Sequence, residues 1–546
     1  MKSYRILHKQ YTLNGGNYQL KLPLELDILI PENDCVRLLS QLVEEMELTA
    51  LYETYDRMPS KKYATPAMML KIMLYAYHEG ICSTRDIEAR CTRDINFRYL
   101  LEGRQAPDHS AIARFRSKHL SLCSDAVMSE LNSILLRLGQ IRDNEVFIDG
   151  TKIEANANKY TFVWKKSVTK NMAKLLQKTA LLVGDIIERN QMKPLWNHEV
   201  RKKNVEKLLR RLRKKAAAES IEFVYGRGCR KPQIQRDIES LVMSLDKISE
   251  YEQKLKKCGN RNSYSKTDTS ATFMHMKDDH MMNGQLKPAY NVQHAVNSGY
   301  IVGTAVFPNP TDTLTFKPFC EYLENDMKLK FKRIVADAGY ESEENLSYLH
   351  DNGKEFYIKP ADYEQRKKRS FSKKIGRKEN MRYDADEDCY ICHRECRLQK
   401  KEEKIRRTGS GYERKVTIYH CTECDGCPYR CECMPGRNWK KPVEERYKKI
   451  EVSKDFEKLR EISYENLGTQ TGKQLMMNRS IQVEGSFADI KWNSEFTRFL
   501  CRGTEKVHAE CTLFAMAHNI GWLHTRIQND KLDLHLYDLK DEEEAV

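Results

Sequence analysis

Residues 477–491 read MNRSIQVEGSFADIK, and the other informative stretches of the chain take their meaning from them. Apolar side chains, among them Ile481 and Phe487, recur near helical spacing, so the stretch predicts an amphipathic helix. Glu484 and Lys491 are seven residues apart, which is two helical turns and puts both on one face. A Glu and a Lys at this spacing usually mark a solvated helix surface, so the pair needs support from elsewhere in the chain.

Two aspartates supply that support, because each one ends a strand-like apolar run. Residues 145–151 read EVFIDGT and contain Asp149, and residues 333–340 read RIVADAGY and contain Asp337. Two aspartates on neighbouring strands, with Glu484 on a later helix, predict a site made only of oxygen ligands. Such a site suits one or two Mg²⁺ ions, or Mn²⁺ in their place.

These stretches resemble the DDE transposases of bacterial insertion sequences. The matching residues are Ile148-Asp149-Gly150-Thr151, Ala336-Asp337-Ala338-Gly339-Tyr340, Glu484 with Phe487 and Lys491, and a fourth group formed by Arg502-Gly503, Val507, Glu510 and Ala517-His518-Asn519. The resemblance extends over roughly residues 20–525. One feature departs from it: many relatives have Tyr and Arg seven and four residues before the Glu. Here Met477 and Ser480 hold those positions, and Arg479 lies one residue off.

The resemblance implies a transposase that binds the terminal inverted repeats of its element and catalyses metal-dependent DNA cleavage and strand transfer. Asp149, Asp337 and Glu484 are then the metal ligands. Lys491 is expected to contact a phosphate near the active site, and Arg479 is a further candidate DNA contact. The implied partners are double-stranded DNA and a second copy of the chain, as a homodimer in a paired-end complex.

Composition agrees with a nucleic-acid partner. The 546 residues carry a formal net charge of +15, which favours a polyanion. No apolar run reaches the roughly 20 residues of a membrane helix, and no signal-peptide core follows the start, so we expect a cytoplasmic protein acting at the bacterial nucleoid, with no membrane partner. The 17 cysteines in a large chain of this kind do not predict a disulfide framework.

Residues 1–130 predict a helical N-terminal DNA-binding domain. Helical periodicity from Val36, a cap with proline at Thr65-Pro66 and a further start at Pro107-Asp108 indicate compact helices joined by short turns. Trihelical modules often place one helix in a DNA groove, although such a domain also serves as plain packing. The candidate DNA-contacting residues on the last of these helices are Arg114, Arg116 and Lys118.

A basic helical insertion is expected at residues 165–260. Residues 201–215 contain nine basic residues in fifteen and only a thin stripe of leucines. The stretch predicts either a solvated helix packed along one edge or an arm that contacts phosphates, and we favour the arm. Its candidate DNA-binding residues are Arg210, Arg211 and Arg213.

The predicted fold class is multidomain α+β. A hairpin turning at Asn297-Ser298-Gly299, the two aspartate strands and the intervening helices indicate a ribonuclease H-like mixed sheet flanked by helices. The sheet domain occupies residues 140–360 and 446–527, with the helical insertion and a Cys-rich insertion at 361–445. Residues 528–546 predict an acidic, disordered tail.

The Cys-rich insertion predicts a structural metal site. The run from Cys421 to Cys431 matches the spacing of a bacterial [4Fe–4S] motif, but it also supplies thiolates for zinc, and unmetallated cysteines are a third option. We favour zinc. The candidate ligands are Cys392, Cys421, Cys424, Cys427 and Cys433.

Other functions remain open at this stage. Glu510 competes with Glu484 as third carboxylate, but Glu484 is accompanied by Phe487 and Lys491. The chain also fits a ribonuclease H-like nuclease that cuts without strand transfer. Two further alternatives are a DNA-binding protein with a catalytically retired site and an iron–sulfur redox protein.

Overall fold

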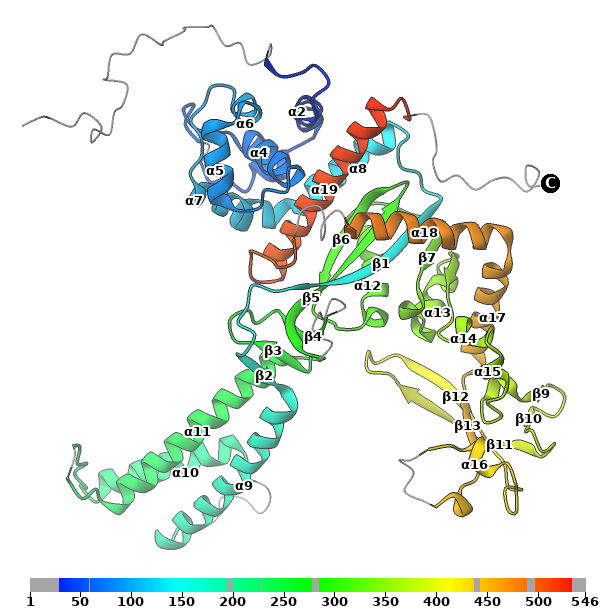
Figure 1. Cartoon of the computed structure of the whole chain (residues 1–546). Helices are drawn as coiled ribbons and strands as arrows, with labels where there is room; N and C mark the ends of the chain where they lie inside the picture. Colours follow the sequence, from blue (N-terminus) through cyan, green and yellow to red (C-terminus); the bar gives the residue numbers. More distant parts are fainter. Residues whose placement is uncertain are drawn as a thin grey trace, which may run out of the picture.

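The computed structural model describes residues 29–57, 59–193, 200–226, 228–276, 284–436, 442–488 and 496–532 (Figure 1). Lys491 and most of the predicted acidic tail lie outside these residues. The described part is a mixed α/β structure with a central sheet, a cap of helices from the N-terminal part of the chain, and two insertions that project from the sheet (Figure 1). This arrangement confirms the multidomain α+β class.

The N-terminal helices begin where their capping residues predict. Asp34 accepts a hydrogen bond from the N–H of Val36, and Thr65 accepts one from the N–H of Met68, so each start is fixed by a local contact. The elements are α2 (Cys35–Glu45), α3 (Thr49–Tyr52), α4 (Pro66–His78), α5 (Thr84–Arg93), α6 (Ile95–Leu100), α7 (His109–Arg114), the π-helical η3 (Phe115–Leu120) and α8 (Ser121–Arg137).

The central sheet has the strand order β4-β5-β1-β7-β8, with β6 paired to β5. Its strands are β1 (Glu145–Glu154), β4 (Thr272–His275), β5 (Leu286–Asn297), β6 (Tyr300–Phe307), β7 (Arg333–Ala336) and β8 (Glu355–Ile358). Strand β1 is antiparallel to β5 and parallel to β7. The predicted hairpin is confirmed: β5 and β6 meet at Ser298 and Gly299, whose φ angles are 52° and 85°.

Helices cover the sheet and join it to the N-terminal cap. They are η4 (Asp312–Leu314), α12 (Phe316–Asn325), η5 (Ala338–Tyr340), α13 (Glu343–Asp351), α17 (Lys454–Gly468), α18 (Gln470–Ala488) and α19 (Thr504–Gln528). Helix α18 crosses β1, β5 and β7, and α19 lies between β6 and the helices α4 and α8 (Figure 1). The cap and the sheet therefore share one continuous hydrophobic core.

The first insertion is a helical arm with a core of its own. It contains β2 (Phe162–Trp164), α9 (Lys165–Arg189), α10 (Lys202–Ala218), α11 (Gln233–Cys258) and β3 (Ser263–Ser265). Val205, Leu208 and Leu212 on α10 are buried against the neighbouring helices, which accounts for the thin leucine stripe. No described helix of the chain is both long enough and apolar enough to span a membrane.

The second, Cys-rich insertion is built on a five-stranded antiparallel sheet. Its elements are α14 (Tyr363–Arg366), α15 (Arg369–Ser372), η6 (Lys378–Asn380), β9 (Arg382–Asp384), β10 (Cys389–Ile391), β11 (Arg397–Arg407), β12 (Glu413–His420), α16 (Arg430–Cys433), η7 (Val443–Glu445) and β13 (Lys449–Val452). Helix α17 then returns the chain to the central sheet.

Candidate active site

Parallel pairing of β1 and β7 brings two of the predicted carboxylates to one edge of the sheet. Ile148 pairs with Ala336, so the residues that follow them, Asp149 and Asp337, occupy equivalent positions on adjacent strands. Each carboxylate accepts a local hydrogen bond: Asp149 from the N–H of Gly150 at 2.7 Å and Asp337 from the N–H of Gly339 at 2.8 Å. The predicted adjacency of the two strands is confirmed.

A single arginine joins the two aspartates. Nη2 of Arg479, on α18, lies 2.9 Å from Oδ2 of Asp149 and 3.9 Å from Oδ2 of Asp337. Its side chain is only 13% exposed, and its buried Nε has no hydrogen-bond partner among the described residues. The two carboxylates thus converge on one positive charge. The Nε–H of this guanidinium remains available to donate a hydrogen bond.

Glu484 lies on the opposite side of the same helix. It follows Arg479 by five residues, which corresponds to about 140° around an α-helix, so the two side chains face in different directions. Glu484 is exposed, and its carboxylate makes no hydrogen bond or ion pair within the described part of the chain. Its neighbours on that face, Met477 and Ile481, are also exposed. Among the described residues, no hydrogen bond or ion pair joins Glu484 to Asp149 or Asp337, and the three do not have ligand atoms within 4.8 Å of one another, so the place of Glu484 in the site stays a prediction.

Phe487, which accompanies Glu484 in the sequence pattern, packs against the central sheet. Its ring stacks on His294 with 4.4 Å between ring centroids, and His294 is the cross-strand partner of Asp149 on β5. Burial lowers the pKa of His294 to about 3, so this ring is neutral at ordinary pH. Phe487 and His294 thus form an uncharged contact between α18 and the sheet, beside Asp149.

A further acid, Asp312, was not predicted from the sequence. It begins η4, just after β6, and its Oδ1 accepts hydrogen bonds from the side-chain amides of Asn291 at 2.8 Å and Gln293 at 3.1 Å. A signal was available, because Asp312 is the first acid after the strand-like run that became β6, as Asp149 and Asp337 follow theirs. It lacks their immediate strand-end position, since four residues separate it from β6.

Tyr340 lies beneath this group of acids and is fully buried. Burial, with the nearby charges of Asp149, Asp312 and Asp337, raises the pKa of its hydroxyl well above the ordinary value. The hydroxyl is therefore a proton donor, and it donates to Oε1 of Gln293.

The rival carboxylate, Glu510, is part of the protein interior. It is 0% exposed, accepts hydrogen bonds from the N–H groups of Leu500 and Cys501, and lies 3.8 Å from Nη1 of Arg116. A carboxylate with these partners holds α19 to η3 and is closed off from solvent. The choice of Glu484 over Glu510 is consistent with this placement.

Comparison with known proteins agrees with these features. A family model described as a transposase DDE domain matches residues 391–524, and a model described as a transposase domain (DUF772) matches residues 24–118. Together they support an insertion-sequence DDE transposase. The DDE match contains Glu484 but begins after Asp149 and Asp337, so the two aspartates stand on the geometry of the sheet. No curated protein and no solved structure gives a significant match to the chain.

The predicted DNA contacts of the N-terminal helices divide into two kinds. Arg114 and Lys118 are exposed on α7 and η3. Arg116 is only 6% exposed, and it donates hydrogen bonds to the Tyr77 hydroxyl and to the carbonyl of Cys82. The assignment of Arg116 as a DNA contact is therefore corrected, because its guanidinium is committed to internal partners.

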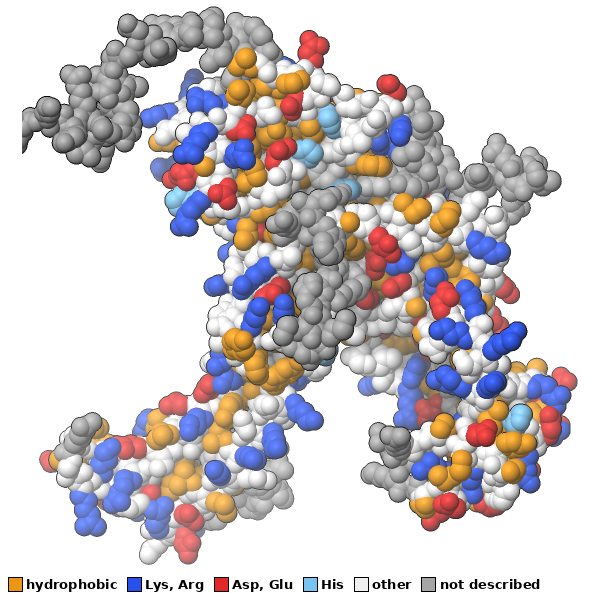
Figure 2. All heavy atoms as spheres, in the orientation of Figure 1, with side chains coloured by type: hydrophobic (Ala, Val, Ile, Leu, Met, Phe, Trp, Pro, Cys, Tyr) orange, Lys and Arg blue, Asp and Glu red, His pale blue; other side chains and the backbone are white. Residues whose placement is uncertain are grey.

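The helical arm carries the basic surface that the sequence predicts. Arg210, Arg211 and Arg213 are exposed on α10, opposite the leucines that pack against α9 and α11. Figure 2 shows Lys and Arg side chains distributed along this arm. Both earlier interpretations, a solvated helix and a phosphate-contacting arm, are compatible with this exposure.

The candidate zinc ligands are gathered in one region of the Cys-rich insertion. Cys421 and Cys424 are buried and pack in a small core with Cys392 beside them. Burial raises the pKa of the Cys433 thiol, and the neighbouring thiols of Cys392, Cys424 and Cys427 act in the same direction. Among the described residues, however, the one group with three ligand atoms within 4.8 Å of one another is Asp384, Glu387 and Cys389. The zinc ligand set stays a prediction.

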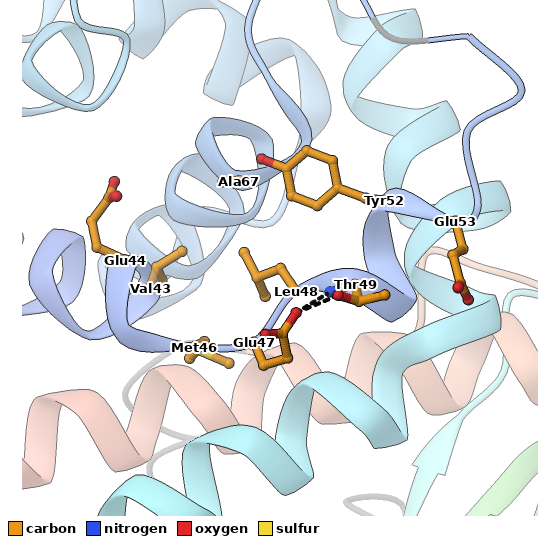
Figure 3. Close-up of a pocket in the computed structure, with 9 residues that line it drawn as sticks. All are labelled: Val43, Glu44, Met46, Glu47, Leu48, Thr49, Tyr52, Glu53 and Ala67. Atoms are coloured by element: carbon orange, nitrogen blue, oxygen red, sulfur yellow. Dashed lines mark hydrogen bonds between the residues drawn. The ribbon is translucent and has the colours of Figure 1, made fainter.

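A hollow on the N-terminal helices is lined by residues other than Asp149, Asp312 and Asp337. It is lined by residues of α2, α3 and α4 and the turns between them, including Glu44, Glu47 and Glu53 (Figure 3). Glu47 accepts a hydrogen bond from the N–H of Thr49 at 3.2 Å, which closes the turn before α3. Its acidic lining does not suit a DNA phosphate, so we assign it no part in the candidate active site.

Proposed function

We propose that the protein is a DNA transposase that binds the terminal inverted repeats of its insertion sequence and catalyses metal-dependent strand cleavage and strand transfer. The observation that carries the proposal is the convergence of Asp149 and Asp337, from adjacent parallel strands, on one cationic group. The mixed sheet with helices on its faces supports a ribonuclease H-like catalytic domain.

The chemistry of the donor set fits a divalent cation. Asp149 and Asp337 offer hard oxygen ligands that already face one positive charge, and Glu484 is the third carboxylate of the proposed set. A bound Mg²⁺ or Mn²⁺ pair supplies a Lewis acid that activates the attacking oxygen and stabilises the leaving 3′ oxygen. The first reaction hydrolyses a phosphodiester at an element end, and the second joins the freed 3′-hydroxyl to target DNA.

The placement of Arg479 and Glu484 implies a rearrangement of α18 before catalysis. Arg479 neutralises the aspartates in the observed state, while Glu484 faces solvent on the other side of the helix. A DNA phosphate is a better partner for the guanidinium, because it accepts two parallel hydrogen bonds and can satisfy the unpartnered Nε. We propose that DNA draws Arg479 away from the aspartates and that Glu484 then turns toward them, with Lys491 contacting a phosphate nearby.

DNA binding is assigned to exposed cations on two parts of the chain. Arg114 and Lys118 on the N-terminal cap are proposed to contact the terminal repeat, and Arg210, Arg211 and Arg213 to contact phosphates without sequence preference. The active form is proposed to be a homodimer that holds two element ends together. It would act in the cytoplasm, at the nucleoid.

The test is cleavage of a labelled duplex that carries the terminal repeat flanking the coding region, with Mg²⁺ or Mn²⁺. Asp149→Ala and Glu484→Ala should abolish nicking at the element end while DNA binding persists. Glu465→Ala, which removes an exposed glutamate from the adjacent helix α17, is the matched control and should cut normally. A joined product with a second duplex distinguishes a transposase from a nuclease that only cuts.

Other outcomes identify the alternatives. If Glu484→Ala cuts as fast as wild type, Glu484 is not the third carboxylate. If wild-type protein binds the repeat but cuts with neither ion, the protein is a DNA-binding derivative of a transposase. A brown chromophore in the purified protein would instead indicate the iron–sulfur alternative.

A further inference from the structure

Asp312 is held in a way that fixes one carboxylate oxygen and leaves the other available. Its Oδ1 accepts from Nδ2 of Asn291 at 2.8 Å and from Nε2 of Gln293 at 3.1 Å. Both amides belong to β5 and are almost completely buried. Oδ2 makes no hydrogen bond within the described part of the chain. These two amide N–H donors fix the orientation of the Asp312 carboxylate.

The orientation of those amides is itself fixed. The Tyr340 hydroxyl donates to Oε1 of Gln293, so Nε2 of Gln293 must point the other way, toward Asp312 and toward Oδ1 of Asn291 at 2.9 Å. Nδ2 of Asn291 then donates to Asp312 and, at 3.2 Å, to the carbonyl of Asn309. A buried chain of side chains therefore presets the Asp312 carboxylate.

The free oxygen of Asp312 is directed at the catalytic aspartates. A Cβ placed on Gly339 would meet Oδ1 of Asp337 at 3.0 Å and Oδ2 of Asp312 at 3.4 Å, so the two carboxylate oxygens are no farther apart than the sum of these distances. A Cβ placed on Gly150, the neighbour of Asp149, would meet Oδ1 of Asp312 at 3.0 Å. Asp312 therefore approaches the site from between the two glycines that follow the catalytic aspartates.

The hydrogen-bond network that holds Asp312 occupies the space beside Gly150. At Gly150 an added Cβ would also lie 2.2 Å from Nε2 of Gln293, which is a collision. Any larger residue would displace the amide that fixes Asp312. The close approach of strand β1 to the Gln293 amide thus depends on glycine at this position.

The charges of Asp149, Asp312 and Asp337 favour a cation as their ligand. The charges of Asp149, Asp312 and Asp337 all raise the pKa of the Tyr340 hydroxyl, and the Arg479 guanidinium lowers it. The ion pairs of Arg479 reach Asp149 and Asp337 but not Asp312. When Arg479 moves to a DNA phosphate, three acids are left close together, and their mutual repulsion is relieved by divalent cations.

We propose that Asp312 is a fourth acidic residue of the metal site, which binds a divalent cation through Oδ2 together with Asp337. This inference rests on the proposed function in assuming that Asp149 and Asp337 hold metal and that Arg479 leaves them when DNA binds. It assigns Asp312 a place in the metal site, either as a direct ligand or through a metal-bound water.

The test measures metal binding directly, without DNA cleavage. Wild-type protein, Asp312→Asn and Asp312→Glu are titrated with Mn²⁺, and free Mn²⁺ is followed by its electron paramagnetic resonance signal. Asp312→Asn should bind Mn²⁺ about 10- to 100-fold more weakly, the range seen when a residue supporting a metal ligand is removed. Asp312→Glu should recover part of that loss, because it restores the charge. Asp351→Asn, which neutralises an exposed acid on α13, is the control and should bind like wild type.

Each outcome decides between the possibilities. Equal Mn²⁺ affinity in wild type and Asp312→Asn overturns the proposal and leaves Asp312 as an anchor of the loop before α12. If Asp312→Asn does not fold, Asp312→Ser is titrated in its place, and a Mn²⁺ affinity equal to that of wild type again overturns the proposal. A wild type that binds Mn²⁺ through Asp312 but never cuts DNA supports the metal site and refutes the transposase activity. A wild type that binds no Mn²⁺ by itself, and none beyond that of the DNA when the terminal-repeat duplex is added, refutes both.

Discussion

Replacing Glu510 with alanine should lower the stability of the core that the N-terminal cap and the sheet share, whereas replacing Glu484 should not. Glu510 is fully buried and is matched by Arg116, which is 6% exposed. The two residues join α19 to η3 of the N-terminal cap. Burial raises the pKa of Glu510, so its ionised form depends on Arg116 and on the two backbone N–H groups that it accepts from.

The magnitude follows from what the substitution leaves behind. Removing one partner of a buried ion pair costs about 3–5 kcal/mol, because the other charge stays buried without compensation. The N–H groups of Leu500 and Cys501 also lose their acceptor, at about 1–3 kcal/mol each where water cannot replace it. These losses overlap, so we expect a total of about 4 kcal/mol and a fall in the melting temperature of roughly 10 °C.

The assay is thermal unfolding followed by circular dichroism, with DNA cleavage measured on the same preparations. Glu484→Ala removes an exposed side chain that makes no hydrogen bond or ion pair with the described residues, so its melting temperature should stay within about 2 °C of wild type while cleavage is lost. Glu510→Gln keeps a hydrogen-bond acceptor and should fall between wild type and Glu510→Ala. A Glu510→Ala variant that melts like wild type yet cannot cut would refute the structural assignment and make Glu510 the third carboxylate.

Three further predictions concern Mn²⁺ binding, DNA binding by the helical arm and zinc binding by the Cys-rich insertion. Arg479→Ala should bind Mn²⁺ more tightly than wild type in the absence of DNA, because no guanidinium competes for Asp149 and Asp337; unchanged affinity in a Mn²⁺ titration would contradict this. Replacing Arg210, Arg211 and Arg213 with alanine should weaken binding to unrelated duplexes and reduce the slope of log K against log salt by about 0.9 for each lost phosphate contact. An unchanged slope would show a solvated helix. Metal analysis should find about one zinc per chain if the predicted thiolate site forms, and Cys421→Ser should lose it, since a tetrahedral site needs four ligands; metal-free protein with freely titrating thiols would exclude the site.

Patterns that depend on near neighbours were predictable. The turn at Asn297-Ser298-Gly299 is confirmed because a two-residue hairpin requires positive φ, which glycine allows. The helix starts at Thr65 and Asp108 are confirmed because each side chain caps a backbone N–H two or three residues away. The pairing of β1 with β7 is confirmed for a related reason, since buried parallel strands carry continuous apolar runs.

Properties that depend on distant contacts were not predictable. Arg114 and Arg116 are alike in type and lie two residues apart, yet one is exposed and the other is buried beside Glu510. Helical periodicity assigns faces only relative to one another, and which face meets the core is decided by elements hundreds of residues away. Asp312 was not predictable for the same reason, because the hydrogen bonds that fix its carboxylate come from Asn291 and Gln293 on another element.

The sequence by itself determined the chemical inventory of this protein. It contains two aspartates that follow apolar, strand-like runs, a glutamate in a late helical pattern, a basic stretch and a Cys-rich stretch, because each of these is a short local pattern. Only the tertiary structure decided which charges meet. It placed Arg479 between Asp149 and Asp337, turned Glu484 to solvent, buried Glu510 and directed Asp312 at the site. The physical reason is that electrostatic interactions act through space, and the distances that set them arise only when the sheet and its helices pack.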